Sequence, residues 1–140
     1  MEMPVVEMIA ELDASVFVID CLPNMTGPEV AQRATPLVRK LREKHPRTPV
    51  VLVEDRTYSN AWLYKSLRER QAASRKALSE SYRELLDEGV ENLYYVTADT
   101  LLGDDGDNDA TVDSSHPSDL GMFRMAESIE SILRPILEDR

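Results

Sequence analysis

The stretch Pro49-Val50-Val51-Leu52-Val53-Glu54 decides the fold class of this chain. Four apolar residues follow one another in it without a polar interruption, and three of them are β-branched valines. Such a run is typical of a strand that is buried on both faces, as in a parallel sheet covered by helices. Two further runs of the same kind, at 15–20 and 92–97, predict two more strands of this sheet.

Apolar residues recur at helical spacing in the segments that follow these runs. One helical pattern follows Pro28, a residue that suits the first turn of a helix. A second covers about 62–88 and stops at Gly89, a favourable residue just past a helix end. A third follows Ser118, a good N-cap residue, and reaches Pro135, which we expect to kink or end the helix.

One more helix is predicted at 4–12, so helices and strands alternate along the whole chain. This order predicts an α/β sandwich of βαβ units, with a parallel sheet between helices. The 140 residues contain no internal repeat and no linker, which favours a single domain over 1–140. Ligands of such folds gather beyond the carboxyl ends of the strands. Here those ends are 20–26, 54–60 and 97–116.

The formal net charge of −10 disfavours nucleic acid as a partner, because phosphate binding relies on lysine and arginine. The basic residues between 39 and 47 stand at helical spacing, and we expect them to form a solvated helix face. No apolar run approaches the roughly 18 residues of a membrane helix, and the start lacks the basic and apolar regions of a signal peptide. The single cysteine, Cys21, excludes an intrachain disulfide and a multi-cysteine metal site. No feature of the sequence assigns a cellular compartment.

The chain has two histidines, which narrows the choice of a general base. His45 lies in a polar break between a predicted helix and a predicted strand, and we interpret it as a solvated loop residue. His116 follows a long polar loop and stands three residues after Asp113. A carboxylate at this spacing can accept the Nδ1–H of the ring, so that Nε2 faces a nucleophile. The alternative interpretation is a loop histidine with a carboxylate nearby by chance.

The first predicted strand is followed by Asp20-Cys21-Leu22-Pro23-Asn24-Met25. The side-chain amide of Asn24, held in a proline-containing loop, could donate a hydrogen bond to a developing oxyanion. Alternatively, Asn24 only turns or caps the chain before the helix that begins near Pro28. Cys21 is a candidate nucleophile, but its place after a strand and next to Asp20 favours an unreactive, buried thiol.

Two of these motifs together resemble the SGNH hydrolases, also called GDSL-type esterases or lipases. The resemblance rests on the strand end at 18–25 and on Asp113-x-x-His116-Pro117-x-Asp119-x-Gly121. It implies a flavodoxin-like three-layer sandwich, a Ser-His-Asp site and hydrolysis of a small-molecule carboxyl ester. It also implies that Asn24 is an oxyanion-hole donor and that Asp113 and His116 are the acid and the base.

The segment 54–62 falls where members of this family keep a substrate-facing loop. Arg56, Tyr58 and Trp62 are therefore candidate contacts to the leaving group or the acyl group of an ester. No cofactor is predicted.

The sequence departs from the family pattern in two places. The family's usual Gly-x-Asn-Asp is here Leu22-Pro23-Asn24-Met25. The nucleophile block Gly-Asp-Ser is absent, since none of the five glycines begins one, and no serine is predicted in a strand-to-helix elbow. We therefore expect the C-terminal portion of a hydrolase domain, N-terminally truncated and inactive by itself.

Two other functions stay open at this stage. One is a non-catalytic binding or interaction module, because a shortened parallel sheet leaves an open edge through which chains can self-associate. The other is a flavodoxin-like ligand binder, which the lack of a glycine-rich phosphate loop disfavours. The carboxylate-rich segment 103–109 suits a hard cation, but a loop that starts at Asp105 has Ala110 and His116 where an EF-hand needs its glycine and glutamate. We therefore expect a solvated acidic loop there and no metal.

Overall fold

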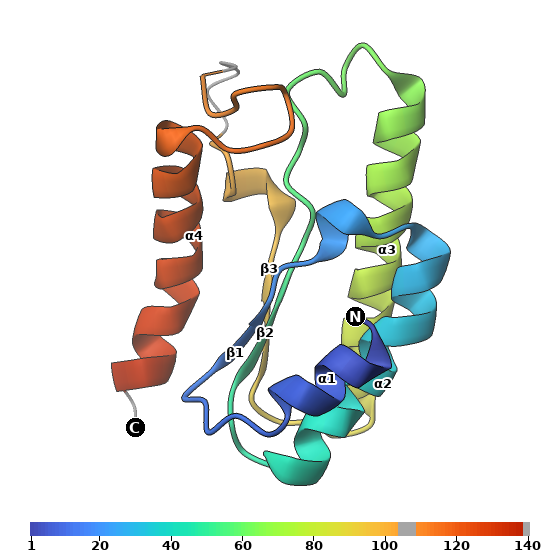
Figure 1. Ribbon diagram of the computed structural model, residues 1–140, viewed down its shortest axis with the longest axis vertical. Coiled ribbons are helices and arrows are strands. Elements are labelled where there is room, and N and C mark those ends of the chain that lie inside the picture. The colour runs from blue at the N-terminus through green and yellow to red at the C-terminus, as the bar shows by residue number, and fades with distance from the viewer. Residues whose placement is uncertain (104–108, 139–140) are drawn as a thin grey trace.

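A parallel sheet of three strands forms the centre of the fold (Figure 1). The strands, in chain order and in sheet order, are β1 (Phe17–Ile19), β2 (Val50–Val53) and β3 (Leu93–Val96). The computed structural model describes residues 1–103 and 109–138. In the central strand β2, Val51 pairs with Val18 on one side and with Tyr94 on the other. All four residues of β2 are buried, which confirms the predicted strand covered on both faces.

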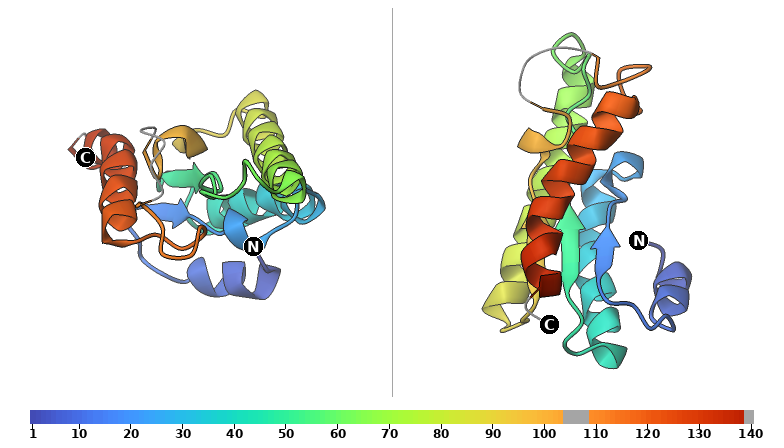
Figure 2. Two further views of the ribbon diagram at one scale, coloured as in Figure 1. Left: turned by 90° about the horizontal axis from the view of Figure 1, so that it is seen from above. Right: turned by 90° about the vertical axis from the view of Figure 1, so that its left-hand side faces the viewer.

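Helices cover both faces of this sheet. They are α1 (Met3–Ile9), α2 (Gly27–Lys44), α3 (Lys65–Asp87) and α4 (Asp119–Glu138), with short 3-10 turns η1 (Leu22–Asn24) and η2 (Ala98–Thr100). Helices α2 and α3 pack side by side on one face, and α4 lies on the other (Figures 1 and 2). Helix α1 packs against α2 beside β1. The predicted three-layer α/β sandwich is therefore confirmed.

Two apolar clusters hold the layers together. Side chains of β2 alternate between the faces of the sheet. Val50 and Leu52 belong to the cluster beneath α2 and α3, whereas Val51 and Val53 belong to the cluster beneath α4. Burying one such side chain completely stabilises the fold by roughly 1.5–3 kcal/mol.

Two of the predicted helix ends are confirmed, and one is not. Gly89, just past the end of α3, has a φ of +81°, a left-handed conformation that glycine adopts without strain. The hydroxyl of Ser118 accepts a hydrogen bond from the N–H of Gly121 at 3.3 Å, as an N-cap does. Pro135 does not end α4, which continues to Glu138. One reason is that Ile136, the next residue, is buried against the core and holds the last turn in place.

The second pattern begins later than predicted. Helix α3 starts at Lys65, and the backbone from Asn60 to Leu63 makes turns in place of a first helical turn. Trp62 therefore lies in the connection between β2 and α3, with 74% of its surface exposed.

None of the helices in residues 1–103 and 109–138 is long and apolar enough to cross a bilayer. In the same residues, no group of three or more histidine, cysteine or acidic side chains could hold a metal ion. Most of the acidic segment predicted as a solvated loop, residues 104–108, lies outside the described residues.

Candidate active site

The three strands point the same way, so their carboxyl ends share one edge of the sheet. The turn η1 follows β1, the segment 54–62 follows β2, and the loop that leads into α4 completes this edge (Figure 1). This is the arrangement that the order of predicted elements requires. Every candidate residue from the sequence lies on one of these three segments.

Asp113 and His116 form a hydrogen-bonded pair in the loop before α4. The Asp113 Oδ2 atom lies 2.7 Å from Nδ1 of His116. The other carboxyl oxygen accepts the backbone N–H of Ser115 at 3.0 Å and that of His116 at 2.8 Å. Ser114 has a φ of +75°, which turns the chain back on itself so that these contacts can form.

These contacts determine the protonation of the pair. The backbone N–H of His116, its ring and the N–H of Ser115 together lower the pKa of Asp113 from 3.8 to about 2. An ionised carboxylate can only accept hydrogen bonds, so Nδ1 of His116 must carry the proton. In the neutral ring, Nε2 is then a free proton acceptor. The His116 side chain is 72% exposed, so this acceptor is accessible.

The segment after β2 packs against this loop. Arg56 Nε donates to the carbonyl of Ser115 at 2.6 Å, and the N–H of Ser59 donates to the carbonyl of Ser114 at 3.0 Å. The Arg56 guanidinium also lies over the ring of Tyr58, 5.9 Å from its centroid. Arg56 and Tyr58 are both buried. Of the three predicted substrate contacts, Arg56 thus packs against the loop that carries His116, and Tyr58 packs against Arg56.

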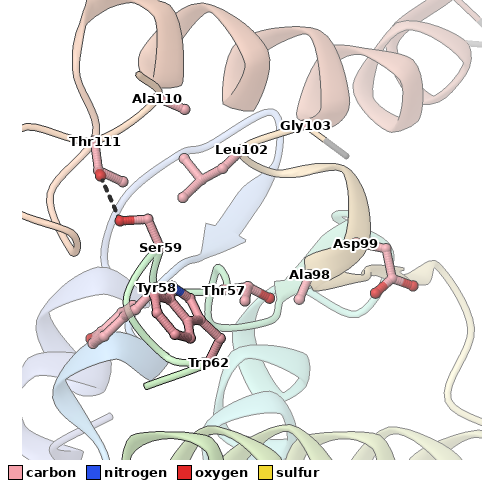
Figure 3. Close-up of a pocket in the computed structure, with 10 residues that line it drawn as sticks. All are labelled: Thr57, Tyr58, Ser59, Trp62, Ala98, Asp99, Leu102, Gly103, Ala110 and Thr111. Carbon is pink, nitrogen blue, oxygen red and sulfur yellow. Dashed lines mark hydrogen bonds between the residues drawn. The ribbon is translucent and has the colours of Figure 1, made fainter. Parts of the chain in front are cut away.

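A pocket of about 320 Å³ adjoins these residues. Tyr58 and Trp62 border it on one side, and Leu102 and Ala110 on the other (Figure 3). A hydrogen bond of 3.1 Å between the hydroxyls of Ser59 and Thr111 crosses between the two sides. The complete lining is Thr57, Tyr58, Ser59, Trp62, Ala98, Asp99, Leu102, Gly103, Ala110 and Thr111.

Asn24 ends η1 with an exposed side chain. Within residues 1–103 and 109–138, no hydrogen bond holds its side-chain amide, and no hydrogen bond joins it to His116. The turn itself is held from α3, because Arg70 Nη2 donates to the carbonyl of Pro23 at 2.8 Å. The amide of Asn24 is therefore available to a ligand.

Cys21 precedes this turn and is half-buried, with its thiol 3.8 Å from the sulfur of Met25. Burial is the main cause that raises the pKa of the thiol, and the charge of Asp20 adds a smaller effect. A raised pKa disfavours the thiolate, so the structure supports an unreactive cysteine here.

The sequence did not reveal a buried polar network beneath the site. Asp55 is 1% exposed, and one of its carboxyl oxygens accepts a hydrogen bond from Gln71 at 3.2 Å. Arg75 donates to the backbone carbonyl of Asp55 at 2.9 Å. Burial raises the pKa of Asp55 against the opposing effects of Gln71 and the nearby arginines. The available signal was the position of Gln71 and Ser74 on the apolar face of α3.

The second histidine lies at the opposite end of the sheet. His45 Nε2 donates to the carbonyl of Ala10 at 2.8 Å, and its ring contacts that of Phe17. His45 is half-buried, so the interpretation of a solvated loop residue is wrong. The cause is α1, which brings Ala10 over the end of α2.

Comparison with known proteins places these motifs in a family. The model of the GDSL-like Lipase/Acylhydrolase family matches residues 1–134. A Bacteroides ovatus protein of known crystal structure, described as a GDSL-like lipase, is 35% identical to this chain with a TM-score of 0.91. The match covers 99% of this chain and 40% of that one.

A second similar structure shows the shared fold only. The salicylyl-acyltransferase SsfX3 of a tetracycline biosynthetic pathway is 19% identical, with a TM-score of 0.75 over 94% of this chain and 40% of its own. No protein of curated function matches the sequence. The chain thus spans 40% of the length of either matched structure. Because the family model covers nearly all of the sequence, this chain belongs to the GDSL-like lipase/acylhydrolase family.

Proposed function

We propose that this chain carries the general base, its orienting acid and one oxyanion donor of a carboxyl-ester hydrolase. His116 is the base, Asp113 the acid and Asn24 the donor. The observation that carries the proposal is the 2.7 Å contact between Asp113 and Nδ1 of His116, with the second carboxyl oxygen held by two backbone N–H groups. Membership of the family supports an ester as the substrate.

The chemistry would follow the scheme of Ser-His-Asp hydrolases. A serine hydroxyl gives its proton to Nε2 of His116 as its oxygen bonds to the ester carbonyl carbon. Asp113 stabilises the imidazolium, and the Asn24 amide donates to the oxyanion, a contact worth roughly 2.7–4 kcal/mol in known cases. When the intermediate collapses, the bond to the leaving alcohol breaks, and His116 returns the proton to that alcohol. Water then releases the acyl group by the same route.

These 140 residues do not contain a Gly-Asp-Ser nucleophile. Within the described residues, no serine hydroxyl is hydrogen-bonded to the ring of His116. The hydroxyl of Ser59, a nearby residue, is hydrogen-bonded to the hydroxyl of Thr111. We therefore infer that the chain by itself hydrolyses esters no faster than the same side chains would in free solution. Catalysis needs a serine from outside these residues.

The pocket lined by Tyr58, Ser59 and Thr111 is the proposed place for the acyl or leaving group, although His116 itself does not line it. Tyr58 and Trp62 line it with aromatic rings, and Leu102 and Ala110 are apolar. A volume of about 320 Å³ lies at the small end of ligand sites, which favours a small ester. Arg56 does not line this pocket, and its contact with substrate stays a prediction.

Hydrolysis of p-nitrophenyl acetate tests this proposal. We expect the chain, His116→Ala and the matched control His45→Ala to release nitrophenol at rates within about twofold of one another. Turnover that His116→Ala abolishes and His45→Ala retains would contradict the claim that the nucleophile lies outside these residues. Rapid turnover that survives His116→Ala would contradict the role of His116.

One observation favours a second candidate function, a non-catalytic interaction module. Val18 of the edge strand β1 is 37% exposed, and Met122 and Phe123 of α4 are more than half exposed on the apolar side. An unpaired parallel edge beside apolar side chains is a surface that another chain can cover. Self-association through β1 is therefore the alternative. Size-exclusion chromatography distinguishes the two functions. A stable monomer contradicts self-association, whereas a dimer that the substitution Val18→Lys dissociates supports it.

A further inference from the structure

Two arginines hold the backbone directly before the two functional residues. Arg70 of α3 donates to the carbonyl of Pro23 at 2.8 Å, and Pro23 precedes Asn24. Arg56 donates to the carbonyl of Ser115 at 2.6 Å, and Ser115 precedes His116. Each arginine therefore binds the peptide group that joins the preceding residue to the functional one.

Each of these peptide groups is also held at its other end. The N–H of Asn24 donates to the carbonyl of Cys21 at 3.2 Å. The N–H of His116 donates to Oδ1 of Asp113 at 2.8 Å. A peptide group is planar, so fixing both its oxygen and its N–H fixes the plane from which the next Cα departs. The backbone that carries Asn24 and His116 is thereby oriented.

The side chains of Asp55 and Arg56, between the strand end and α3, are both buried. The positive charges of Arg56 and Arg70 both act on the Asp55 carboxylate, together with that of Arg75. Asp55 is 1% exposed, and its Oδ1 atom has no hydrogen-bond partner in the described part of the chain. Arg56 is 8% exposed, so its charge is also largely removed from water.

We propose that Arg56 and Arg70 are positioning residues for His116 and Asn24. Arg56 sets the base loop and Arg70 sets the oxyanion loop, each through one carbonyl. The proposal rests on the proposed function for what the two loops do. It extends that function by making the segment after β2 and the first turns of α3 part of the machinery.

Helix α3 offers a matched control. Arg68 also donates to backbone carbonyls, those of Ala61 and Trp62 at 2.8 and 2.6 Å. It holds neither Pro23 nor Ser115. Arg68→Gln thus removes the same kind of contact from the same helix without touching the base loop or the oxyanion loop.

Nuclear magnetic resonance of the 140-residue chain tests the proposal. In Arg56→Gln and in Arg56→Lys, we expect the pKa of Asp113 to rise from about 2 toward its ordinary 3.8, because the N–H groups of Ser115 and His116 lose their alignment. The lysine variant matters because it keeps the charge but cannot reproduce the planar guanidinium contact. Arg68→Gln leaves this titration unchanged.

The oxyanion loop has its own readout. In Arg70→Gln we expect the backbone amide of Asn24 to exchange with solvent about tenfold faster, and the titration of Asp113 to stay as it is. Arg68→Gln again moves neither.

Three results overturn the proposal. The first is a folded Arg56→Gln with an unchanged Asp113 titration. The second is a rise in the pKa of Asp113 in Arg56→Gln but not in Arg56→Lys, because the effect would then come from the charge of Arg56 and not from its position. The third is unchanged Asn24 exchange in Arg70→Gln. If a glutamine variant does not fold, the same measurement is made on the lysine variant at that position. None of these readouts depends on ester hydrolysis, so failure of the proposed function leaves them interpretable.

Discussion

The two ends of the sheet use the same side-chain chemistry for different purposes. At the amino end, Arg42 donates to four backbone carbonyls at 2.6–3.2 Å, and all four belong to loops with no candidate site residue. At the carboxyl end, Arg56 and Arg70 each hold one carbonyl, and that carbonyl precedes a candidate site residue. Arg42 closes loops, whereas the proposed role of Arg56 and Arg70 is to orient them. The carbonyls bound by Arg42 are those of His45, Thr48, Glu91 and Asn92.

The two histidines show the same contrast. The Nε2–H of His45 donates a hydrogen bond to the carbonyl of Ala10, and the residue is half-buried. The Nδ1–H of His116 donates a hydrogen bond to Asp113, and the His116 side chain is largely exposed. The Nε2 atom of His45 is engaged in a hydrogen bond inside the protein, whereas Nε2 of His116 is free to accept a proton. Residue type alone does not separate a structural histidine from a candidate base, but the partner and the exposure do.

The largest predicted effect is at the amino end. Arg42→Met leaves four carbonyls without their donor, so we expect the free energy of unfolding to fall by about 3 kcal/mol. Arg70→Met removes one such contact and should cost about 1 kcal/mol. Urea unfolding measures both. Equal costs would contradict the division of roles between the two ends.

The histidines give a smaller effect. His45→Ala removes a hydrogen bond and a ring contact with Phe17, so we expect a loss of about 1–2 kcal/mol. His116→Ala removes an exposed ring and should change the free energy of unfolding by less than about 0.5 kcal/mol. Thermal unfolding of the two variants measures both changes in stability. A larger loss for His116→Ala than for His45→Ala would reverse the comparison.

The smallest effect concerns pH. The folded-state pKa of Asp113, about 2, lies below its ordinary 3.8, so its ionised form stabilises the folded state above pH 3.8. This contribution fades as the pH falls from 3.8 toward about 2. We therefore expect Asp113→Asn to be less stable than the wild type near neutral pH and equally stable near pH 2. Urea unfolding at both pH values checks this, with Asp13→Asn, an exposed loop acid, as the control. A stability difference that is the same at both pH values would contradict the lowered pKa.

The sequence predicts the layers of the fold and the local part of the site. The apolar run at 50–53 indicates a strand covered on both faces, because no polar residue interrupts it. The pair of Asp113 and His116 is predictable because the two residues are three positions apart, so a single turn can join them. Pro135 misleads because a proline penalty is local, whereas the burial of Ile136 depends on the core.

The contacts of Arg56 and Arg70 with backbone carbonyls cannot be predicted from the sequence. Arg70 and Pro23 are 47 positions apart, and Arg56 and Ser115 are 59 apart. Which carbonyl an arginine reaches is set by how α3 and the strand ends pack, and no local pattern records that. The same holds for Asp55, whose burial depends on the helix above it.

The tautomers of the two histidines test the central claim most directly. Nitrogen-15 spectra are recorded about two pH units above the ordinary histidine pKa of about 6.5, where a ring is neutral. The account predicts opposite tautomers in one spectrum: the proton on Nε2 in His45, because Ala10 accepts it, and on Nδ1 in His116, because Asp113 accepts it. A proton on Nε2 of both rings would contradict the account, since His116 would then have no free Nε2 with which to act as a base.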